Sequence, residues 1–187
     1  MPEPPQPITS TPEDYLRAER QADFKSEFVD GTAVAMSGAS LAHNALVANI
    51  IMELGPRLRE RGCRIYPSDL KVRQGSRFFY PDVSVICGEP EFHDNERDVV
   101  LNPSLLVEVL SPSTEKYDKG IKFLTYQQIP SLQEYLLVHQ DTALVEIYRR
   151  HSAGSWLYSR TDGLDNALTV LDLELSLSQL YTGVLQS

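Results

Sequence analysis

Two acidic residues occupy positions at which a carboxylate needs a binding partner. Asp82 comes directly before the strand-like run of residues 83–86, and Glu108 lies inside the nearly continuous apolar run of residues 105–110. An ionised side chain in such a run is costly unless it is paired, hydrogen-bonded or bound to a cation. If both runs are strands of one sheet, the two carboxylates can form an oxygen-rich site suited to Mg²⁺ or Mn²⁺. The alternative is that Glu108 lies at a sheet edge, where solvent or an arginine satisfies it.

A lysine follows the second acid at helical spacing. Residues 111–114, Ser-Pro-Ser-Thr, break the Glu108 strand and can cap a helix over about residues 115–128. In that helix Asp118 and Lys122 form an i, i+4 pair on one face, near the end of the strand. Such pairs are commonly surface salt bridges, so the spacing alone leaves both a catalytic lysine and a structural ion pair open.

The elements that must position these residues alternate between helices and strands. Thr11-Pro12-Glu13-Asp14 has the cap, proline and acid of a helix start, and Asp30-Gly31 indicates a hairpin turn. From Ser40 the apolar residues recur at the i, i+3, i+4, i+7 spacing of an amphipathic helix, which ends by Arg61-Gly62. Strands are predicted over residues 24–29, 32–36, 64–73, 78–86, 105–110, 134–139 and 143–150. The predicted order is α, ββ, α, ββ, β, α, β, β, with a buried sheet.

Length and composition are those of an ordinary globular protein. The 187 residues fit one domain, and 42% hydrophobic with 23% charged residues exclude wholesale disorder, collagen-like repeats and a coiled coil. We expect a flexible Pro-rich arm over residues 1–10 and a single domain over residues 11–187. Cys63 and Cys87 form no CxxC motif, so we interpret them as packing residues of a protein from a reducing compartment.

Charge and hydropathy limit the partners. Lys plus Arg number 17 against 26 Asp plus Glu, and the net charge of −9 argues against coating nucleic acid or anionic membrane by bulk charge. The sequence shows no export signal and no run of 18 apolar residues, so we expect a cytoplasmic protein without membrane contact. Seven basic residues against two acids between Arg57 and Arg77 form either a local phosphate-binding patch or a solvated face.

Four short motifs, taken together and in this order, resemble a known family. They are Tyr80-Pro81-Asp82-Val83, Glu108-Val109-Leu110-Ser111-Pro112-Ser113-Thr114, Asp118 with Lys122, and Ile129-Pro130-Ser131-Leu132-Gln133-Glu134-Tyr135. From about Pro12 to the C-terminal strands, the chain resembles the Uma-two family of restriction-endonuclease-like proteins, a domain of unknown function in the PD-(D/E)XK nuclease superfamily. The resemblance implies an α/β (α+β) fold: a restriction-endonuclease-like mixed central sheet flanked by helices, with an N-terminal hairpin and extra C-terminal strands.

The same resemblance implies an endonuclease, a hydrolase that acts on phosphodiester bonds in nucleic acid, with DNA the expected form. Asp82 and Glu108 would hold Mg²⁺ or Mn²⁺, and Lys122 would orient the attacking water or stabilise charge on the phosphate. The superfamily pattern has a lysine two residues after the second acid, where this chain has Leu110. In the family a lysine on the following helix substitutes, and the matching residue here is Lys122.

Glu27 and His43 match two further positions of the family. Glu27 would supply another carboxylate to the metal ion, or it is a solvated hairpin residue. His43 stands at the end of the apolar stripe of the long helix, and it is either a site residue or a hydrogen-bonded packing residue. Asp69 could face Asp82 across a strand pair, or it could bind a lysine.

Other functions stay open beside the nuclease. Leu110 and the acidic surface favour a non-catalytic module that binds nucleic acid or protein on the same fold. A phosphodiesterase acting on a small substrate would explain the lack of a broad basic surface. The alternating residues 171–177 predict a half-buried strand that completes the sheet or pairs with a second subunit in a homodimer. Motifs of acyl transfer, P-loops, Rossmann cofactors and zinc proteolysis are missing from the sequence.

Overall fold

The largest element of the structure is a six-stranded mixed sheet, called the central sheet below. The protein is seen in a computed structural model that describes residues 11–185, so the arm predicted over residues 1–10 lies outside the described residues. The strand order is β11-β10-β9-β8-β6-β3, in which β8 and β9 are parallel and the other neighbours are antiparallel. The strands are β3 (Cys63–Pro67), β6 (Val83–Cys87), β8 (Leu105–Leu110), β9 (Glu134–His139), β10 (Leu144–Arg150) and β11 (Trp156–Asp162), and the short 3-10 helix η2 (Ser152–Gly154) precedes β11.

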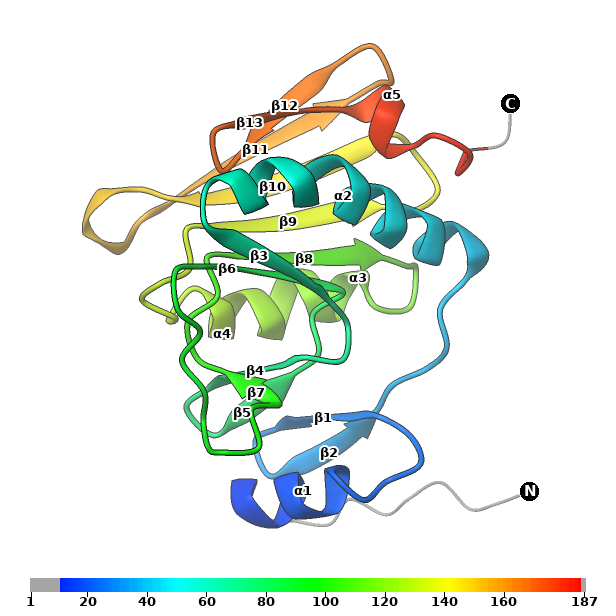
Figure 1. Cartoon of the computed structure of the whole chain (residues 1–187). Helices are drawn as coiled ribbons and strands as arrows, with labels where there is room; N and C mark the ends of the chain where they lie inside the picture. Colours follow the sequence, from blue (N-terminus) through cyan, green and yellow to red (C-terminus); the bar gives the residue numbers. More distant parts are fainter. Residues whose placement is uncertain (1–10, 186–187) are drawn as a thin grey trace.

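Helices cover both faces of the central sheet (Figure 1). On one face lies α2 (Leu41–Glu60), whose buried residues recur every four positions: Leu46, Ile50, Leu54 and Leu58. The other face is covered by a helix in three parts: α3 (Glu115–Tyr117), the π-helical η1 (Asp118–Lys122) and α4 (Phe123–Tyr126). The first of these helices was predicted from its apolar spacing, and the second from the strand break and possible cap at residues 111–114. Within residues 11–185, no helix combines the length and apolar character needed to cross a bilayer.

A second sheet of five strands has the order β2-β1-β5-β4-β7. Its strands are β1 (Ser26–Val29), β2 (Thr32–Ala35), β4 (Lys71–Gln74), β5 (Arg77–Phe79) and β7 (Val99–Val100). β1 and β2 form the predicted hairpin, and its turn residues Asp30 and Gly31 have φ angles of 50° and 86°. The short α1 (Pro12–Glu19) packs against this sheet, where Tyr15 stacks on Phe28.

The β runs predicted over residues 64–73 and 78–86 are wrong as single strands. Each run is interrupted, and its two halves belong to different sheets: β3 and β6 to the central sheet, β4 and β5 to the second sheet. The first interruption is a turn at residues 68–70. The second contains Pro81, which has no N–H for a strand ladder. This second break places Asp82 at the start of β6.

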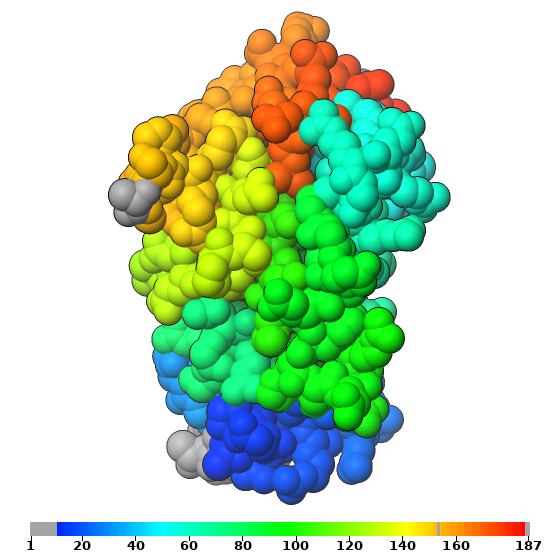
Figure 2. Space-filling view, turned by 60° about the vertical axis from the view of Figure 1, so that its left-hand side comes forward, coloured from blue at the N-terminus to red at the C-terminus, as the bar shows by residue number. Residues whose placement is uncertain are grey.

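The C-terminal part forms a small sheet of its own. β12 (Ala167–Val170) pairs with β13 (Leu173–Ser176), and α5 (Leu177–Leu180) follows. The alternating run predicted over residues 171–177 therefore pairs with β12 and does not complete the central sheet. Its buried Leu173 and Leu175 join the apolar cluster around α2. Figure 2 shows this part of the chain, in orange and red, beside α2 in cyan.

The interpretation of the two cysteines as separate packing residues is wrong. Cys63 and Cys87 are joined by a disulfide, and they lie directly opposite each other in the antiparallel pair of β3 and β6. Their separation of 24 residues along the chain gives no information on which residues face each other across the two strands. The bond closes the segment that contains β4 and β5 into a covalent loop.

Candidate active site

Glu108 lies in the interior of the central sheet, on the face covered by α4. Along β8, Val107 and Val109 pack in the cluster around α2, whereas Leu106 and Leu110 pack with α4 on the opposite face. Because side chains alternate along a strand, Glu108 shares the face of Leu106 and Leu110. β8 is flanked by β6 and β9, and Glu108 is only 2% exposed. The alternative of a solvated edge residue is therefore excluded.

Asp82 lies beside Glu108 at the start of the neighbouring strand. β6 begins at Val83, which pairs with Val107, so Asp82 stands opposite Glu108 in the antiparallel register. The Oδ2 atom of Asp82 accepts a hydrogen bond of 2.7 Å from the backbone N–H of Val109. The structure thus brings the two predicted acids together, and a main-chain bond fixes the orientation of Asp82.

His43 reaches the same carboxylate from the first turn of α2. The backbone N–H of His43 donates to Oγ of Ser40, the N-cap residue of that helix. Its Nε2 lies 3.0 Å from Oδ2 of Asp82. Its Nδ1 is buried and has no hydrogen-bond partner among the described residues. The contact with Asp82 places His43 at the site, and it is more than a packing residue of the helix.

Glu27 enters the same region from the second sheet. Its Oε1 accepts a hydrogen bond of 3.0 Å from the backbone N–H of Tyr80 and lies 3.1 Å from Nζ of Lys122. Glu27 is 4% exposed, because β1 is paired on both sides, with β2 and with β5. The alternative of a solvated hairpin residue is therefore wrong.

The ammonium group of Lys122 contacts three acids: Glu108, Glu27 and Asp118. Lys122 belongs to η1, a π-helical turn, and such turns are frequent at functional sites. Its Nζ lies 3.0 Å from Glu108 Oε1, 3.1 Å from Glu27 Oε1 and 3.3 Å from Asp118 Oδ1. Lys122 and Asp118 are both buried, so their i, i+4 pair is not a surface salt bridge.

The sequence interpretation missed Tyr126 and left Asp118 without a role of its own. The hydroxyl of Tyr126 donates a hydrogen bond of 3.1 Å to Oε1 of Glu108. The ring of Tyr117 lies 5.6 Å from Nζ of Lys122, a cation–π distance. Asp118, Lys122 and Tyr126 are spaced at i, i+4 and i+8, so a polar stripe on the helix after the Glu108 strand was the signal that could have found them.

Burial and charge repulsion determine the protonation of this cluster. Burial raises the pKa of Glu108 well above its ordinary value; neighbouring carboxylates add to this rise, and Lys122 offsets only part of it. Burial also raises the pKa of Asp118. Burial alone would favour the neutral amine of Lys122, but the attraction of four acids outweighs it and raises the pKa of Lys122 well above its ordinary value. The amine therefore stays charged at neutral pH.

The donor set of the cluster fits a hard divalent ion. The carboxyl groups of Glu27, Glu108 and Asp118 contact a single ammonium group, and Asp82 lies opposite Glu108, so acidic groups outnumber basic ones in a largely buried place. Mg²⁺ and Mn²⁺ prefer carboxylate oxygens with water as the remaining ligands. The repulsion that contributes to the raised pKa of Glu108 is the repulsion that a divalent ion relieves. Asp82, Glu108 and Glu27 are the residues that could hold it.

Asp69 does not contribute to this cluster. It lies in the turn after β3, its side chain is 83% exposed, and it pairs with Lys25. The hypothesis that Asp69 faces Asp82 across a strand pair is therefore wrong, because β3 ends at Pro67, opposite Val83.

The basic residues between Arg57 and Arg77 are largely bound within the protein. Arg57 and Arg61 donate to backbone carbonyls of the C-terminal part, at residues 171–174. Lys71 and Arg77 form ion pairs with acids of other segments. These groups stabilise the fold, which reduces the predicted phosphate-binding patch to the residues that stay exposed, such as Arg59 and Arg64.

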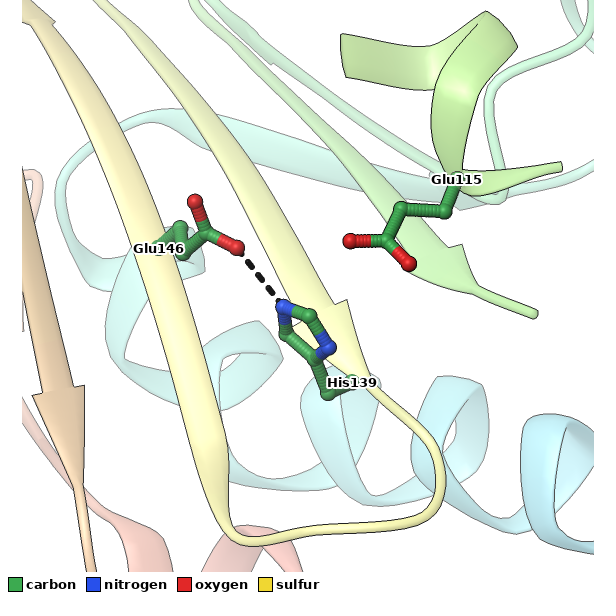
Figure 3. A group of neighbouring side chains, drawn as sticks. All are labelled: Glu115, His139 and Glu146. Atoms are coloured by element: carbon green, nitrogen blue, oxygen red, sulfur yellow. Dashed lines mark hydrogen bonds and ion pairs between the residues drawn. The ribbon is translucent and has the colours of Figure 1, made fainter. Parts of the chain in front are cut away.

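A different group of potential metal ligands consists of Glu115, His139 and Glu146, whose ligand atoms lie within 4.8 Å of one another (Figure 3). Nε2 of His139 lies 2.7 Å from Oε1 of Glu146. Nζ of Lys119 lies 2.7 Å from Glu115 and 2.6 Å from Glu146, so one ammonium group already pairs with both acids. The three ligands come from α3, β9 and β10, and no sequence motif pointed to them. We call this group the His139 cluster.

The fold and the paired acids define a restriction-endonuclease-like α+β protein. Residues 12–181 match the Uma2 (Uma-two) family, whose description is "Putative restriction endonuclease". The chain belongs to this family, which confirms the resemblance seen in the sequence motifs.

Relatives and a solved structure share most of the chain. The chain is 42% identical over 155 residues to the "Uncharacterized protein sll1609" of Synechocystis sp., covering 82% of this chain and 88% of that protein. It is 35% identical over 179 residues to the "Uncharacterized protein slr1290" of the same organism, covering 93% and 92%. A crystal structure of "a putative nuclease belonging to DUF820" from Anabaena variabilis has a TM-score of 0.77 at 19% identity, covering 92% of this chain and 98% of that one. This last likeness supports the fold.

Proposed function

We propose that the protein is a metal-dependent nuclease that hydrolyses phosphodiester bonds in nucleic acid, with DNA as the expected substrate. The observation that carries the proposal is the convergence of three carboxylates, those of Glu27, Glu108 and Asp118, on the ammonium group of Lys122, with Asp82 opposite Glu108 on the neighbouring strand. An excess of buried negative charge is costly in a protein that binds no cation there. Membership of the Uma2 family supports the nuclease class.

Asp82, Glu108 and Glu27 are the proposed ligands of Mg²⁺ or Mn²⁺. When bound, such an ion supplies Lewis-acid activation of the scissile phosphate and of a water molecule. Asp82 is oriented for this role by the N–H of Val109 and by His43. The Tyr126 hydroxyl holds Glu108 in the same way from the helix side.

Lys122 is the proposed cationic group of the reaction. Its ammonium group donates hydrogen bonds, and its raised pKa keeps it charged while the phosphate gains negative charge. Since Leu110 occupies the position that carries a lysine in the superfamily pattern, the charge reaches the acids from η1 and not from β8. No covalent intermediate is needed, because a water molecule can act as the nucleophile.

The test is cleavage of plasmid, linear duplex DNA, single-stranded DNA and RNA with Mg²⁺ or Mn²⁺. Asp82→Asn, Glu108→Gln and Lys122→Met should each lower the rate by about a hundredfold or more. Matched controls are Asp69→Asn, which removes an exposed acid, and Lys116→Met, which removes an exposed lysine from the same helix. Both controls should cleave like the wild type.

Three results would speak against the proposal. Cleavage that survives Asp82→Asn points to a contaminating nuclease or another site. A wild-type protein that binds these nucleic acids but cleaves none of them is a binding module on the nuclease fold. Hydrolysis of bis(p-nitrophenyl) phosphate without cleavage of any nucleic acid indicates a phosphodiesterase for small substrates.

A further inference from the structure

Lys122 contacts two carboxylates, those of Glu27 and Glu108, that are also proposed to bind the metal ion. Its Nζ contacts Oε1 of Glu27 and Oε1 of Glu108, two of the proposed metal ligands. A metal ion bound by these carboxylates would repel the ammonium group and compete for the same oxygens. A divalent ion bound by Glu27 and Glu108 would therefore weaken their hold on Lys122.

Lys122 cannot simply turn out into water. Its side chain is 6% exposed, and it is enclosed by the second sheet, β8 and its own helix. A buried ammonium group without a counter-ion is strongly unfavourable. The charge needs an acceptor that stays within reach after the ligands have turned to the metal ion.

Asp118 meets this requirement. Its Oδ1 lies 3.3 Å from Nζ of Lys122, and its side chain is 4% exposed. It precedes Lys122 by four residues on the same helix, so the two side chains stay neighbours whatever Glu27 and Glu108 do. The backbone of Asp118 is held in place, since its N–H donates to the carbonyl of Thr114 and its carbonyl accepts from the Tyr135 hydroxyl.

We propose that Asp118 is the positioning residue of Lys122: it keeps the ammonium group at the site when Glu27 and Glu108 bind the divalent ion. This inference rests on the proposed function. It gives Asp118 a role that differs from that of a further metal ligand, because Asp118 would act on the metal ion only through Lys122.

The test is the affinity for Mn²⁺, measured by calorimetry on a double-mutant cycle of wild type, Asp118→Asn, Lys122→Met and the double variant. Lys122→Met removes the competing ammonium group and should bind Mn²⁺ more tightly. Asp118→Asn leaves the ammonium group to Glu27 and Glu108 and should bind Mn²⁺ more weakly. The loss caused by Asp118→Asn should be about tenfold larger with Lys122 present than in the Lys122→Met background.

Control variants separate this coupling from a general effect of charge. Glu115→Gln removes a carboxylate from the same helix, but one that pairs with Lys119, and it should leave Mn²⁺ affinity at the Asp82 site unchanged. Asp118→Glu keeps the charge and should restore most of the affinity. If Asp118→Asn weakens Mn²⁺ binding equally in both backgrounds, Asp118 is a direct ligand or a distant charge, and the inference is overturned.

A crystal structure of the wild-type protein with Mn²⁺ decides the question even if a variant fails to fold. The expected result is Mn²⁺ on Asp82 and Glu108, with Lys122 hydrogen-bonded to Asp118 and withdrawn from Glu108. Mn²⁺ coordinated by Asp118 would overturn the inference but leave the proposed function standing. If no Mn²⁺ binds to Asp82 and Glu108, both the inference and the proposed function fail.

Discussion

His43 and Asp82 are joined across the end of the central sheet. Nε2 of His43, in the first turn of α2, lies 3.0 Å from Oδ2 of Asp82, and the N–H of Val109 donates to the same oxygen. Lys122 approaches the acids from the opposite face, where α4 packs. The carboxylate of Asp82 is thus held from the α2 side while its neighbours are held from the α4 side.

Replacement of His43 should therefore weaken metal binding without unfolding the protein. His43→Ala removes one of the two groups that orient Asp82, and the loss of such an outer-shell partner typically lowers metal affinity about 10–100-fold. Calorimetric titration with Mn²⁺ measures this loss, and the exposed His151→Ala is the matched control. Equal affinities of His43→Ala and the wild type would show that the Val109 bond suffices.

The metal site can be told apart from the His139 cluster by a second pair of variants. If Asp82, Glu108 and Glu27 hold the ion, Asp82→Asn should abolish the rise in melting temperature that Mn²⁺ causes, because only ligands that bind the folded state stabilise it. His139→Ala should keep that rise, since Lys119 already pairs with Glu146. Thermal melts with and without Mn²⁺ give the answer, and the reverse pattern would move the metal site to the His139 cluster.

Tyr126→Phe tests the hydrogen bond to Glu108. The bond is 3.1 Å long and buried, and its loss should lower the free energy of unfolding by about 1 kcal/mol. The ring keeps its edge contacts with Phe79 and Tyr135, so no cavity is created. Urea unfolding measures the change. Tyr158→Phe, whose hydroxyl bonds Glu146 instead, is the control: its Mn²⁺ affinity should match the wild type, whereas that of Tyr126→Phe should fall.

The elements of the fold could be predicted largely from local signals. The limits of β9 follow from its apolar run, and α2 follows from its four-residue spacing and the cap at Ser40. Contacts between distant segments had no such signal. Glu27 is buried because β1 pairs with β5, and this pairing depends on the whole second sheet.

The candidate site shows the same division. Glu108 could be identified from the sequence because an ionised side chain inside an apolar strand has a high free-energy cost, and the apolar run around it is visible in the sequence. The helical spacing identified the pair of Asp118 and Lys122, but not that both are buried. That burial arises where the second sheet closes over η1, through residues such as Glu27 of β1, while the ring of Tyr117 in α3 covers the ammonium group. The opposition of Cys63 and Cys87 likewise depends on a strand register and not on their spacing.

Removal of the disulfide should lower the free energy of unfolding, because the unfolded chain gains conformational entropy without the cross-link. Cys63 and Cys87 close a loop over a separation of 24 residues, and a loop of this length stabilises the folded state by about 3.5 kcal/mol in the chain-entropy model. Urea unfolding of Cys63→Ala/Cys87→Ala, beside the air-oxidised wild type, measures the loss. Thiol titration of the unfolded, unreduced protein should find no free thiol. Detection of both thiols would contradict the bond.

Stability in acid should depend on Asp98. Burial alone would raise the pKa of Asp98, but hydrogen bonds from Arg20 and Lys71 outweigh it and lower the pKa to about 2. A lowered pKa stabilises the folded state above the unfolded value of 3.8, and this contribution disappears as the pH falls through about 2.

At pH 7, Asp98→Asn should therefore be less stable than the wild type by about 2 kcal/mol, and the difference should shrink between pH 4 and about 2. Urea unfolding at a series of pH values measures it. The control is Asp162→Asn, which breaks an exposed pair with Arg160 and should change stability by less than about 1 kcal/mol at any pH. A difference for Asp98→Asn that stays constant down to pH 2 would mean that Arg20 and Lys71 do not depend on the charge of Asp98.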